Sequence, residues 1–92
     1  MPQTYERMTS FTQNGWEDYR YWQEQGRKTF KRVNDLIRDI QRDPYEGIGK
    51  PEPLRGELSG MWSRRINERD RLIYSIKDEG ITIHAMYGHY DD

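Results

Sequence analysis

The clearest periodicity in the chain lies between residues 28 and 42. Charged side chains lie on one side of the helix that this spacing would form. The apolar positions fall on a single stripe on the opposite side: Phe30, Val33, Leu36, Ile37 and Ile40. This spacing predicts an amphipathic helix with one buried face. Pro44 ends it, because the residue before a proline disfavours the α-helical region.

A shorter aromatic repeat comes earlier in the chain: Trp16, Tyr19 and Trp22. It predicts a first helix from about residue 15 to residue 25, capped by Thr12 or Asn14 and broken by Gly26. Residues 7–12 alternate weakly between apolar and polar positions and are predicted to form an edge strand. Residues 1–6 carry no pattern and are expected to be poorly ordered.

The second half of the chain alternates as β-strands do. Turn signals at Ser59-Gly60 and at 78–80 divide it into predicted strands at 54–58, 61–67, 71–77 and 81–90. The run 43–56 holds three prolines and three glycines without periodicity, and a loop of this length in a small domain is often functional. The order of elements predicts one α+β domain over 1–92, with two N-terminal helices packed on an antiparallel sheet.

Composition narrows the class of protein. Hydrophobic residues make up 33% of the chain, a low share that three tryptophans and seven tyrosines partly offset. There is no cysteine and there are two histidines, so neither a disulfide nor a metal cluster is expected, and no other cofactor is implied. No apolar run reaches membrane-spanning length and the N-terminus lacks a secretory pattern, which predicts a cytoplasmic protein without a membrane segment.

Charge is unevenly distributed along the chain. The formal net charge is −1, which argues against a strongly basic nucleic-acid-binding protein. Residues 50–77 nevertheless hold seven basic and four acidic side chains, a balance of +3, whereas residues 78–92 hold four acidic and no basic ones. A local basic patch beside an acidic end can still attract a polyanion.

Alternation along the strands assigns side chains to faces. In 61–67, Trp62, Arg64 and Ile66 share one face and Ser63 and Arg65 the other. In 71–77, Leu72, Tyr74 and Ile76 form an apolar face. Arg71, Ile73 and Ser75 lie on the opposite face. In 81–90, one face is predicted to hold alternate residues: Ile81, Ile83, Ala85, Tyr87 and His89. This pattern allows two arginines and a terminal imidazole or aromatic group to converge, and a bulge would change the pairing.

Such a convergence fits metal-independent cleavage of RNA. The reaction needs a base for the 2′-hydroxyl, an acid for the departing 5′-oxygen and cations for the charge on the phosphoryl oxygens. Glu52, held between two prolines, is a candidate base, and His89 a candidate acid. Arg65 and Arg71 are candidate phosphate ligands, since a guanidinium fork matches phosphate geometry, and Tyr90 could stack on a base or bind phosphate.

Simpler interpretations exist for each of these residues. Arginines on strands are usually solvated or paired with nearby carboxylates such as Glu68 and Asp70. A histidine near a terminus is more often exposed or structural, and a glutamate between prolines is often a solubilising loop residue. A general RNA-binding domain is less well supported, because the strands lack an aromatic platform and a long basic stripe.

Longer stretches add a family resemblance. The segment 44-PYEGIGKPEPLRGELSGMWSRRINERDRLIYSI-76, followed by 87-YGHY-90, resembles the YoeB toxin family. The upstream segment 15-GWEDYRYWQEQGRKTFKRVNDLIRDIQRDP-44 is similar to the two helices of that family. The similarity spans about residue 7 to residue 90, and its motifs are specific in combination rather than singly.

The resemblance implies a microbial-ribonuclease-like fold shared with RelE-type toxins. It also implies the toxin of a type II toxin–antitoxin system, an endoribonuclease that cuts mRNA in the ribosomal A site without metal and leaves a 2′,3′-cyclic phosphate. The implied partners are a YefM-like antitoxin, the ribosome with its mRNA, a second copy of the chain, and promoter DNA only as the toxin–antitoxin complex.

Transferred motif by motif, the resemblance places the family's catalytic glutamate on Glu52 and its phosphate-binding arginines on Arg65 and Arg71. Its terminal histidine and tyrosine fall on His89 and Tyr90. Three further basic residues are expected to contact RNA or phosphate: Lys50, Arg55 (where the family has a lysine) and Arg64.

The chain departs from the family pattern at its end. Gly88 replaces a bulky residue, and Asp91 and Asp92 extend the chain beyond the usual last tyrosine. Carboxylates beside a histidine would raise its pKa and repel phosphate. The alternative is therefore a weakly active or inactive toxin homologue that serves as an antitoxin-binding and autoregulatory module.

Overall fold

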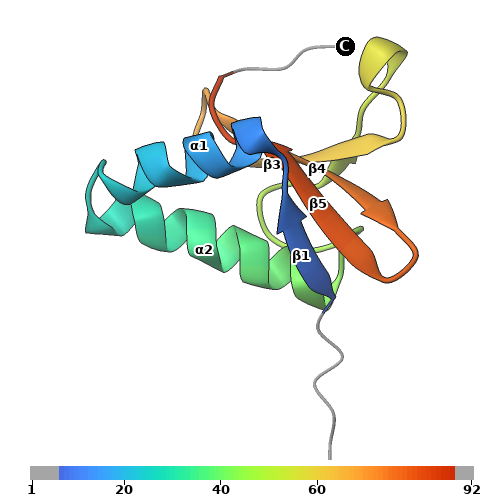
Figure 1. Ribbon diagram of the computed structural model, residues 1–92, viewed down its shortest axis with the longest axis horizontal. Coiled ribbons are helices and arrows are strands. Elements are labelled where there is room, and N and C mark those ends of the chain that lie inside the picture. Colours follow the sequence, from blue (N-terminus) through green and yellow to red (C-terminus); the bar gives the residue numbers. More distant parts are fainter. Residues whose placement is uncertain (1–6, 89–92) are drawn as a thin grey trace, which may run out of the picture.

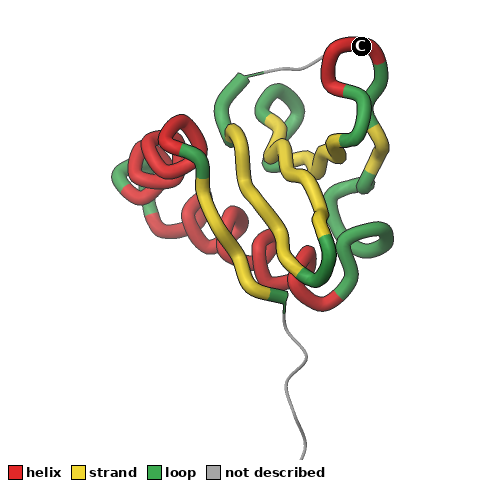
Figure 2. The backbone as a smooth tube through the Cα atoms, turned by 45° about the vertical axis from the view of Figure 1, so that its right-hand side comes forward, coloured by secondary structure: helices red, strands yellow, loops and turns green. Residues whose placement is uncertain are grey.

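The computed structural model describes residues 7–88. Two helices lie against a five-stranded sheet whose strand order is β1-β5-β4-β3-β2 (Figure 1). The elements follow one another along the chain as β1 (Met8–Phe11), α1 (Gln13–Gln23), α2 (Arg27–Arg42), β2 (Glu52–Pro53), a 3₁₀ turn η1 (Gly56–Leu58), β3 (Met61–Arg65), β4 (Arg71–Lys77) and β5 (Gly80–Ala85). The predicted packing of two helices on one face of a sheet is confirmed, since α1 and α2 lie against the same face (Figure 2).

Both helices follow the predicted pattern. Thr12 caps α1, its hydroxyl accepting a hydrogen bond from the Gly15 amide at 3.0 Å, which leaves one fewer unpaired donor in the first turn. Gly26 separates the helices with φ of +113°, a conformation that side chains with a Cβ rarely adopt. The apolar stripe of α2 is buried through Val33, Leu36 and Ile40. These residues pack against Leu72, Tyr74, Ile81, Ile83 and Met86 in the main core.

The sequence had predicted a wholly antiparallel sheet, but the sheet is mixed. β1 runs parallel to β5, with Met8 opposite Gly80 and Phe11 opposite Ile83. The other neighbouring pairs are antiparallel. Alternation assigns side chains to faces but contains no information on strand direction, so this difference could not be deduced from the pattern. The predicted edge position of the first strand is confirmed.

A β-bulge divides β5 from the alternation expected of it. Ile73 of β4 pairs with Ala85, whereas the next residue, Tyr74, pairs with Ile83. One extra residue on β5 therefore moves Ala85 to the face opposite Ile83, which corrects the prediction that the two share a face. Ala85 packs with Ile73 in a small second cluster on the face away from the helices, completed by Leu54, Leu58 and Met61.

The predicted strand at 54–58 is wrong. The paired segment is only Glu52–Pro53, and the chain then turns through η1. Pro53 cannot donate to a ladder, and Gly56 has φ of +65°, which turns the chain out of the extended conformation. The last strand likewise ends at Ala85 rather than at residue 90, the final predicted residues lying outside the described part of the chain.

Candidate active site

Backbone pairing aligns four segments in one row across the sheet. Arg65 on β3 lies directly opposite Arg71 on β4. On one side, the Arg65 amide donates to the Gly49 carbonyl at 2.7 Å; on the other, the Arg71 amide donates to the Gly88 carbonyl at 3.0 Å. These bonds hold four segments next to one another: residues 49–50, the last residue of β3, the first residue of β4, and the chain after β5.

Glu52 lies diagonally from this row, on the neighbouring strand β2. It is the pairing partner of Ser63, which is two residues from Arg65 and on the same face. Glu52 and Arg65 are thus diagonal cross-strand neighbours, for which Cβ atoms lie about 7–8 Å apart or somewhat less, within reach of long side chains. The face is the one away from the helices, and Glu52 and Arg65 are both exposed on it.

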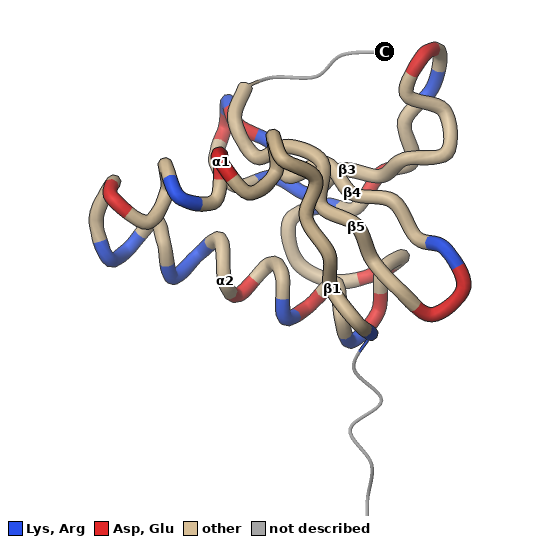
Figure 3. The backbone as a smooth tube through the Cα atoms, in the orientation of Figure 1, with Lys and Arg blue, Asp and Glu red and all other residues tan. Residues whose placement is uncertain are grey.

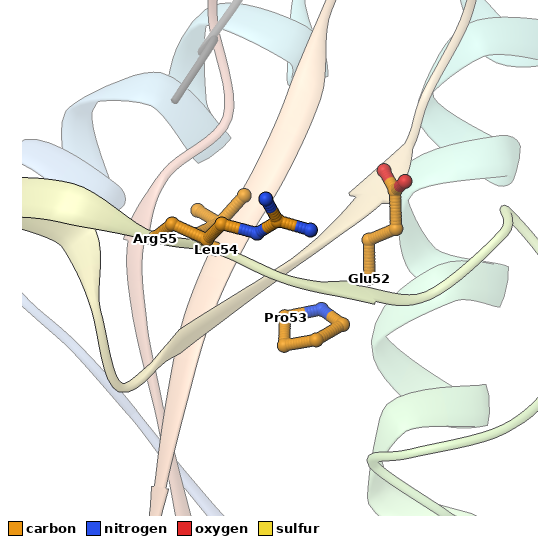
Figure 4. Close-up of a pocket in the computed structure, with 4 residues that line it drawn as sticks. All are labelled: Glu52, Pro53, Leu54 and Arg55. Atoms are coloured by element: carbon orange, nitrogen blue, oxygen red, sulfur yellow. The ribbon is translucent and has the colours of Figure 1, made fainter.

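A hollow of about 140 Å³ lies beside Glu52. Its lining consists of Glu52, Pro53, Leu54 and Arg55 (Figure 4). The Glu52 carboxylate and the Arg55 guanidinium lie on the same side of the chain, and Pro53 lies on the other. A carboxylate and a guanidinium at the rim of a small hollow could together contact one sugar–phosphate unit.

Arg71 is half-buried and partly engaged within the protein. Its Nη1 donates to the carbonyls of Asn67 at 3.0 Å and Asp70 at 3.3 Å. These bonds fix the guanidinium against the 66–70 turn, so its orientation is set before any ligand arrives. Five N–H donors on a guanidinium leave room for a phosphate in addition to these carbonyls.

Arg64 is not a phosphate ligand, which corrects the sequence prediction. Its side chain has no exposed surface. Nη1 donates to Asp39 Oδ2 at 2.7 Å and to the Ile48 carbonyl at 2.8 Å, and Nη2 donates to the Asp43 carbonyl at 2.7 Å. Nε donates to the Tyr74 hydroxyl at 3.1 Å. The guanidinium thus ties the 43–49 loop to the sheet, on the helix side.

Asp39 completes this buried pair. Burial alone would raise the pKa of its carboxyl, but hydrogen bonds from Arg64, the Ile48 amide and Arg42 outweigh burial and hold the pKa below its usual value. Asp39 therefore stays ionised, and Arg64 keeps a counter-charge. By holding the 43–49 loop, Arg64 and Asp39 also fix the position at which the chain reaches Gly49 and pairs with Arg65.

Lys50 lies at the start of the row and is exposed. Its φ of +52° is unusual for a residue with a side chain. The pairing of Gly49 with Arg65 holds the chain at this point, so the ammonium group projects from a fixed backbone. Charged positions elsewhere are interspersed rather than segregated, as Figure 3 shows along α2.

The chain after β5 is anchored by side chains to which the sequence interpretation gave no role in the site. Trp22 Nε1 donates to the Met86 carbonyl at 2.7 Å, and Asp18 Oδ2 accepts from the Met86 amide at 2.8 Å. Asp70 Oδ1 accepts from the Gly88 amide at 2.9 Å. The candidate residues His89 and Tyr90 lie outside the described residues.

Residues 7–88 hold neither a candidate metal site nor a candidate membrane span. No group of three or more histidine, cysteine, aspartate or glutamate side chains in this range could hold a metal ion. No helix in the same range is long and apolar enough to cross a membrane.

Comparison with known proteins assigns the chain to a family. Residues 11–90 match the model of the YoeB-like toxin of bacterial type II toxin–antitoxin systems. The toxin YoeB of Streptomyces coelicolor is 54% identical over 81 residues, which cover 88% of this chain and 96% of that protein.

Solved structures agree. The YoeB dimer from Staphylococcus aureus matches with a TM-score of 0.83 and 41% identity, over 92% of this chain and 99% of that chain. The YoeB–YefM complex from the same organism matches with a TM-score of 0.81 and 42% identity, over 91% of this chain and 99% of that chain. The resemblance in the sequence is thereby confirmed: the chain belongs to the YoeB-like toxins of bacterial type II toxin–antitoxin systems.

Proposed function

We propose that this toxin is a ribosome-dependent mRNA endonuclease that uses general acid–base chemistry without a metal ion. The observation that carries the proposal is the pairing of Arg65 with Arg71 beside Gly88, the residue that precedes His89, with Glu52 as the diagonal neighbour of Arg65 on the same face. One carboxylate and two guanidinium groups on one face supply a base and charge stabilisation for a phosphodiester.

In the proposed reaction Glu52 takes the proton from the 2′-hydroxyl. The resulting oxygen attacks the adjacent phosphorus, and the bond between phosphorus and the 5′-oxygen breaks. His89 gives its proton to that leaving oxygen, so the products are a 2′,3′-cyclic phosphate and a 5′-hydroxyl. Arg65 and Arg71 hold the non-bridging oxygens, where negative charge increases in the transition state. Tyr90, Lys50 and Arg55 are proposed to contact the neighbouring RNA.

Dependence on the ribosome follows from the exposure of the site. Glu52 and Arg65 are open to water, where their electrostatic effect on a phosphate is weak. Docking of the toxin in the A site would exclude water and hold the mRNA in a conformation suited to in-line attack. Arg64 contributes indirectly, by holding the loop that leads to Lys50 and Glu52.

The proposed partners follow from the relatives. A YoeB from Staphylococcus aureus has been solved in complex with YefM and also as a dimer. We propose that this chain likewise binds a YefM-like antitoxin, forms a homodimer, and contacts promoter DNA only as the toxin–antitoxin complex. A cytoplasmic location is implied by a ribosomal target.

The test is cleavage of a defined mRNA on purified ribosomes, with product ends analysed. Wild type should give 2′,3′-cyclic phosphate ends at ribosome-bound codons, and Glu52→Gln, Arg65→Met and His89→Ala should each lower the rate by 10²-fold or more, an order of magnitude typical of acid–base and charge-stabilising groups. Glu57→Gln, an exposed carboxylate on η1 outside the row, is the matched control and should cleave like wild type.

The competing function, an inactive antitoxin-binding module, gives a different result. It predicts that wild type binds the antitoxin tightly, does not arrest growth of a sensitive host, and cleaves no faster than Glu52→Gln. Growth arrest that is lost in His89→Ala supports the nuclease instead.

A further inference from the structure

Asp70 is a buried acidic residue that neither catalysis nor phosphate binding explains. It is 7% exposed although it lies one residue before Arg71. Its carboxylate makes two hydrogen bonds to different parts of the chain. Oδ2 accepts from Asn67 Nδ2 at 3.0 Å, within the 66–70 turn, and Oδ1 accepts from the Gly88 amide at 2.9 Å, beyond the end of β5.

The turn itself does not need the second of these bonds. It is closed by the Ile66 amide donating to the Asp70 carbonyl at 2.9 Å. Asn67 Oδ1 also accepts from the amides of Arg69 and Asp70 at 2.8 and 2.7 Å. The bond from Gly88 to Asp70 therefore serves the chain after β5, where the strand ladder has already ended.

That segment is anchored at two points. Trp22 and Asp18 on α1 hold the peptide groups of Met86. Two residues later, Gly88 is held on both sides, its amide by the Asp70 carboxylate and its carbonyl by the Arg71 amide. Gly88 has φ of +105°, and a glycine can adopt many other conformations at a similar free energy. The direction of the backbone at Gly88 therefore depends on these two hydrogen bonds.

We infer that Asp70 is a positioning residue for the toxin, fixing Gly88 against the Arg71 strand and so setting where the chain continues into His89. This inference rests on the proposed function, in which His89 donates the proton to the leaving oxygen. A carboxylate oxygen is a stronger acceptor than a neutral amide oxygen, so it is suited to holding a glycine that would otherwise sample several conformations. Proton transfer is sensitive to displacements of this kind.

The carboxamide exchange between positions 67 and 70 provides a sharp test. In Asp70→Asn, an amide nitrogen must face either the Asn67 Nδ2 group or the Gly88 amide, so two donors oppose each other. The exchanged double variant, Asn67→Asp with Asp70→Asn, restores every acceptor and donor and keeps the net charge. We expect the single variant to lower the single-turnover cleavage rate on ribosomes roughly tenfold, with ribosome binding unchanged, and the double variant to recover most of the rate.

A thermodynamic cycle with His89→Ala separates positioning from a general loss of stability. If Asp70 acts through His89, Asp70→Asn lowers the residual rate of His89→Ala no further, since there is no acid left to misplace. Asn34→Ala is the control: it removes the Tyr19 hydroxyl's partner at 2.8 Å, far from the site, and should leave the rate at the wild-type level while the protein remains folded. Thermal unfolding confirms that each variant is folded at the assay temperature.

Hydrogen exchange supplies a readout independent of activity. The Gly88 amide should exchange faster in Asp70→Asn than in wild type and be protected again in the exchanged double variant. Equal exchange in all three proteins, or multiplicative rate losses in the cycle with His89→Ala, overturns the inference. If His89→Ala abolishes cleavage but Asp70→Asn leaves it intact, the inference about Asp70 is overturned and the proposed function still holds. Cleavage that neither Glu52→Gln nor His89→Ala changes overturns the proposed function instead.

Discussion

Two adjacent arginines on β3 should respond to the same substitution in opposite ways. Arg64 is fully buried and Arg65 is exposed, although they share a residue type, a strand and a motif. Replacing each by methionine removes the charge and keeps the length of the aliphatic stem. We expect Arg64→Met to destabilise the fold and Arg65→Met to leave stability nearly unchanged while removing cleavage.

The magnitude for Arg64 follows from its contacts. Three oxygens lie within 2.8 Å of its guanidinium nitrogens, those of Asp39, Asp43 and Ile48. Hydrogen bonds to a charged group contribute about 1.5–3 kcal/mol each, so a simple sum is roughly 5–9 kcal/mol. Asp39 has a side chain 16% exposed and the loop is near solvent, so partial rehydration reduces the loss. Removal of one member of a buried ion pair typically costs about 3–5 kcal/mol, which is the expected value here.

A loss of this size is large for a small domain. At 0.05–0.15 kcal/mol per residue, a 92-residue chain has a free energy of unfolding of about 5–14 kcal/mol. With an m-value of about 1–1.5 kcal/mol per molar urea, the unfolding midpoint of Arg64→Met should fall by roughly 2–5 M. Arg65→Met should stay within about 0.5 kcal/mol of wild type, as exposed substitutions usually do.

Equilibrium urea unfolding followed by tryptophan fluorescence measures both variants. Arg64→Lys adds a check, because a lysine keeps the charge but cannot reach three oxygens with a rigid fork, and it should recover only part of the loss. A midpoint for Arg64→Met within 0.5 M of wild type, or equal losses for the two arginines, would show that the buried network does not stabilise the loop as argued.

Three shorter predictions concern packing and pH. Gly15→Ala places a Cβ about 2.2 Å from the Ile83 carbonyl oxygen, so α1 must shift and thermal unfolding should show a loss of roughly 1–3 kcal/mol, whereas Gly80→Ala, with 3.6 Å to its nearest neighbours, should be tolerated. Burial lowers the pKa of His84 below its usual value of 6.5, so the unfolded state binds a proton first and stability should fall as pH drops below about 6.5, a slope that His84→Gln removes. Hydrogen bonds, which outweigh the opposing effect of burial, lower the pKa of Asp39 below 3.8, so its contribution to stability should persist above that pH and be lost on further acidification, but be smaller in Arg64→Met.

The elements that were predicted well are those with a regular apolar repeat and a clear end. The second helix was expected at 28–42 and lies at Arg27–Arg42, and the strand expected at 71–77 matches β4. In both, apolar residues recur at the period of the element over several repeats, and a clear breaker or turn follows. Of the two caps predicted for the first helix, Thr12 and Asn14, the structure uses Thr12, whose hydroxyl oxygen accepts from a free amide of the first turn.

The site was only partly accessible from the sequence because its geometry depends on register. The faces of Arg65 and Arg71 followed from alternation, and they lie opposite each other. The bulge between Ile83 and Ala85 had no compositional signal, since an inserted residue leaves the hydrophobic content unchanged. Asp70 was noted only as a carboxylate near the arginines, because nothing in the sequence indicates that a residue 18 positions away would donate to it.

Arg64 shows how the sequence could have been used more strictly. Alternation places it with Trp62 and Ile66, and Ile66 is 5% exposed in the main core. A charged residue between two core positions must be buried, and a buried guanidinium requires a counter-charge and several acceptors. α2 carries a carboxylate at position 39 and the proline-rich connector supplies free carbonyls, so both requirements can be met. For two adjacent arginines, the face of the strand is therefore a better guide than the motif: it predicts that Arg64 is buried and holds the loop, and that Arg65 is exposed, as the proposed phosphate contact requires.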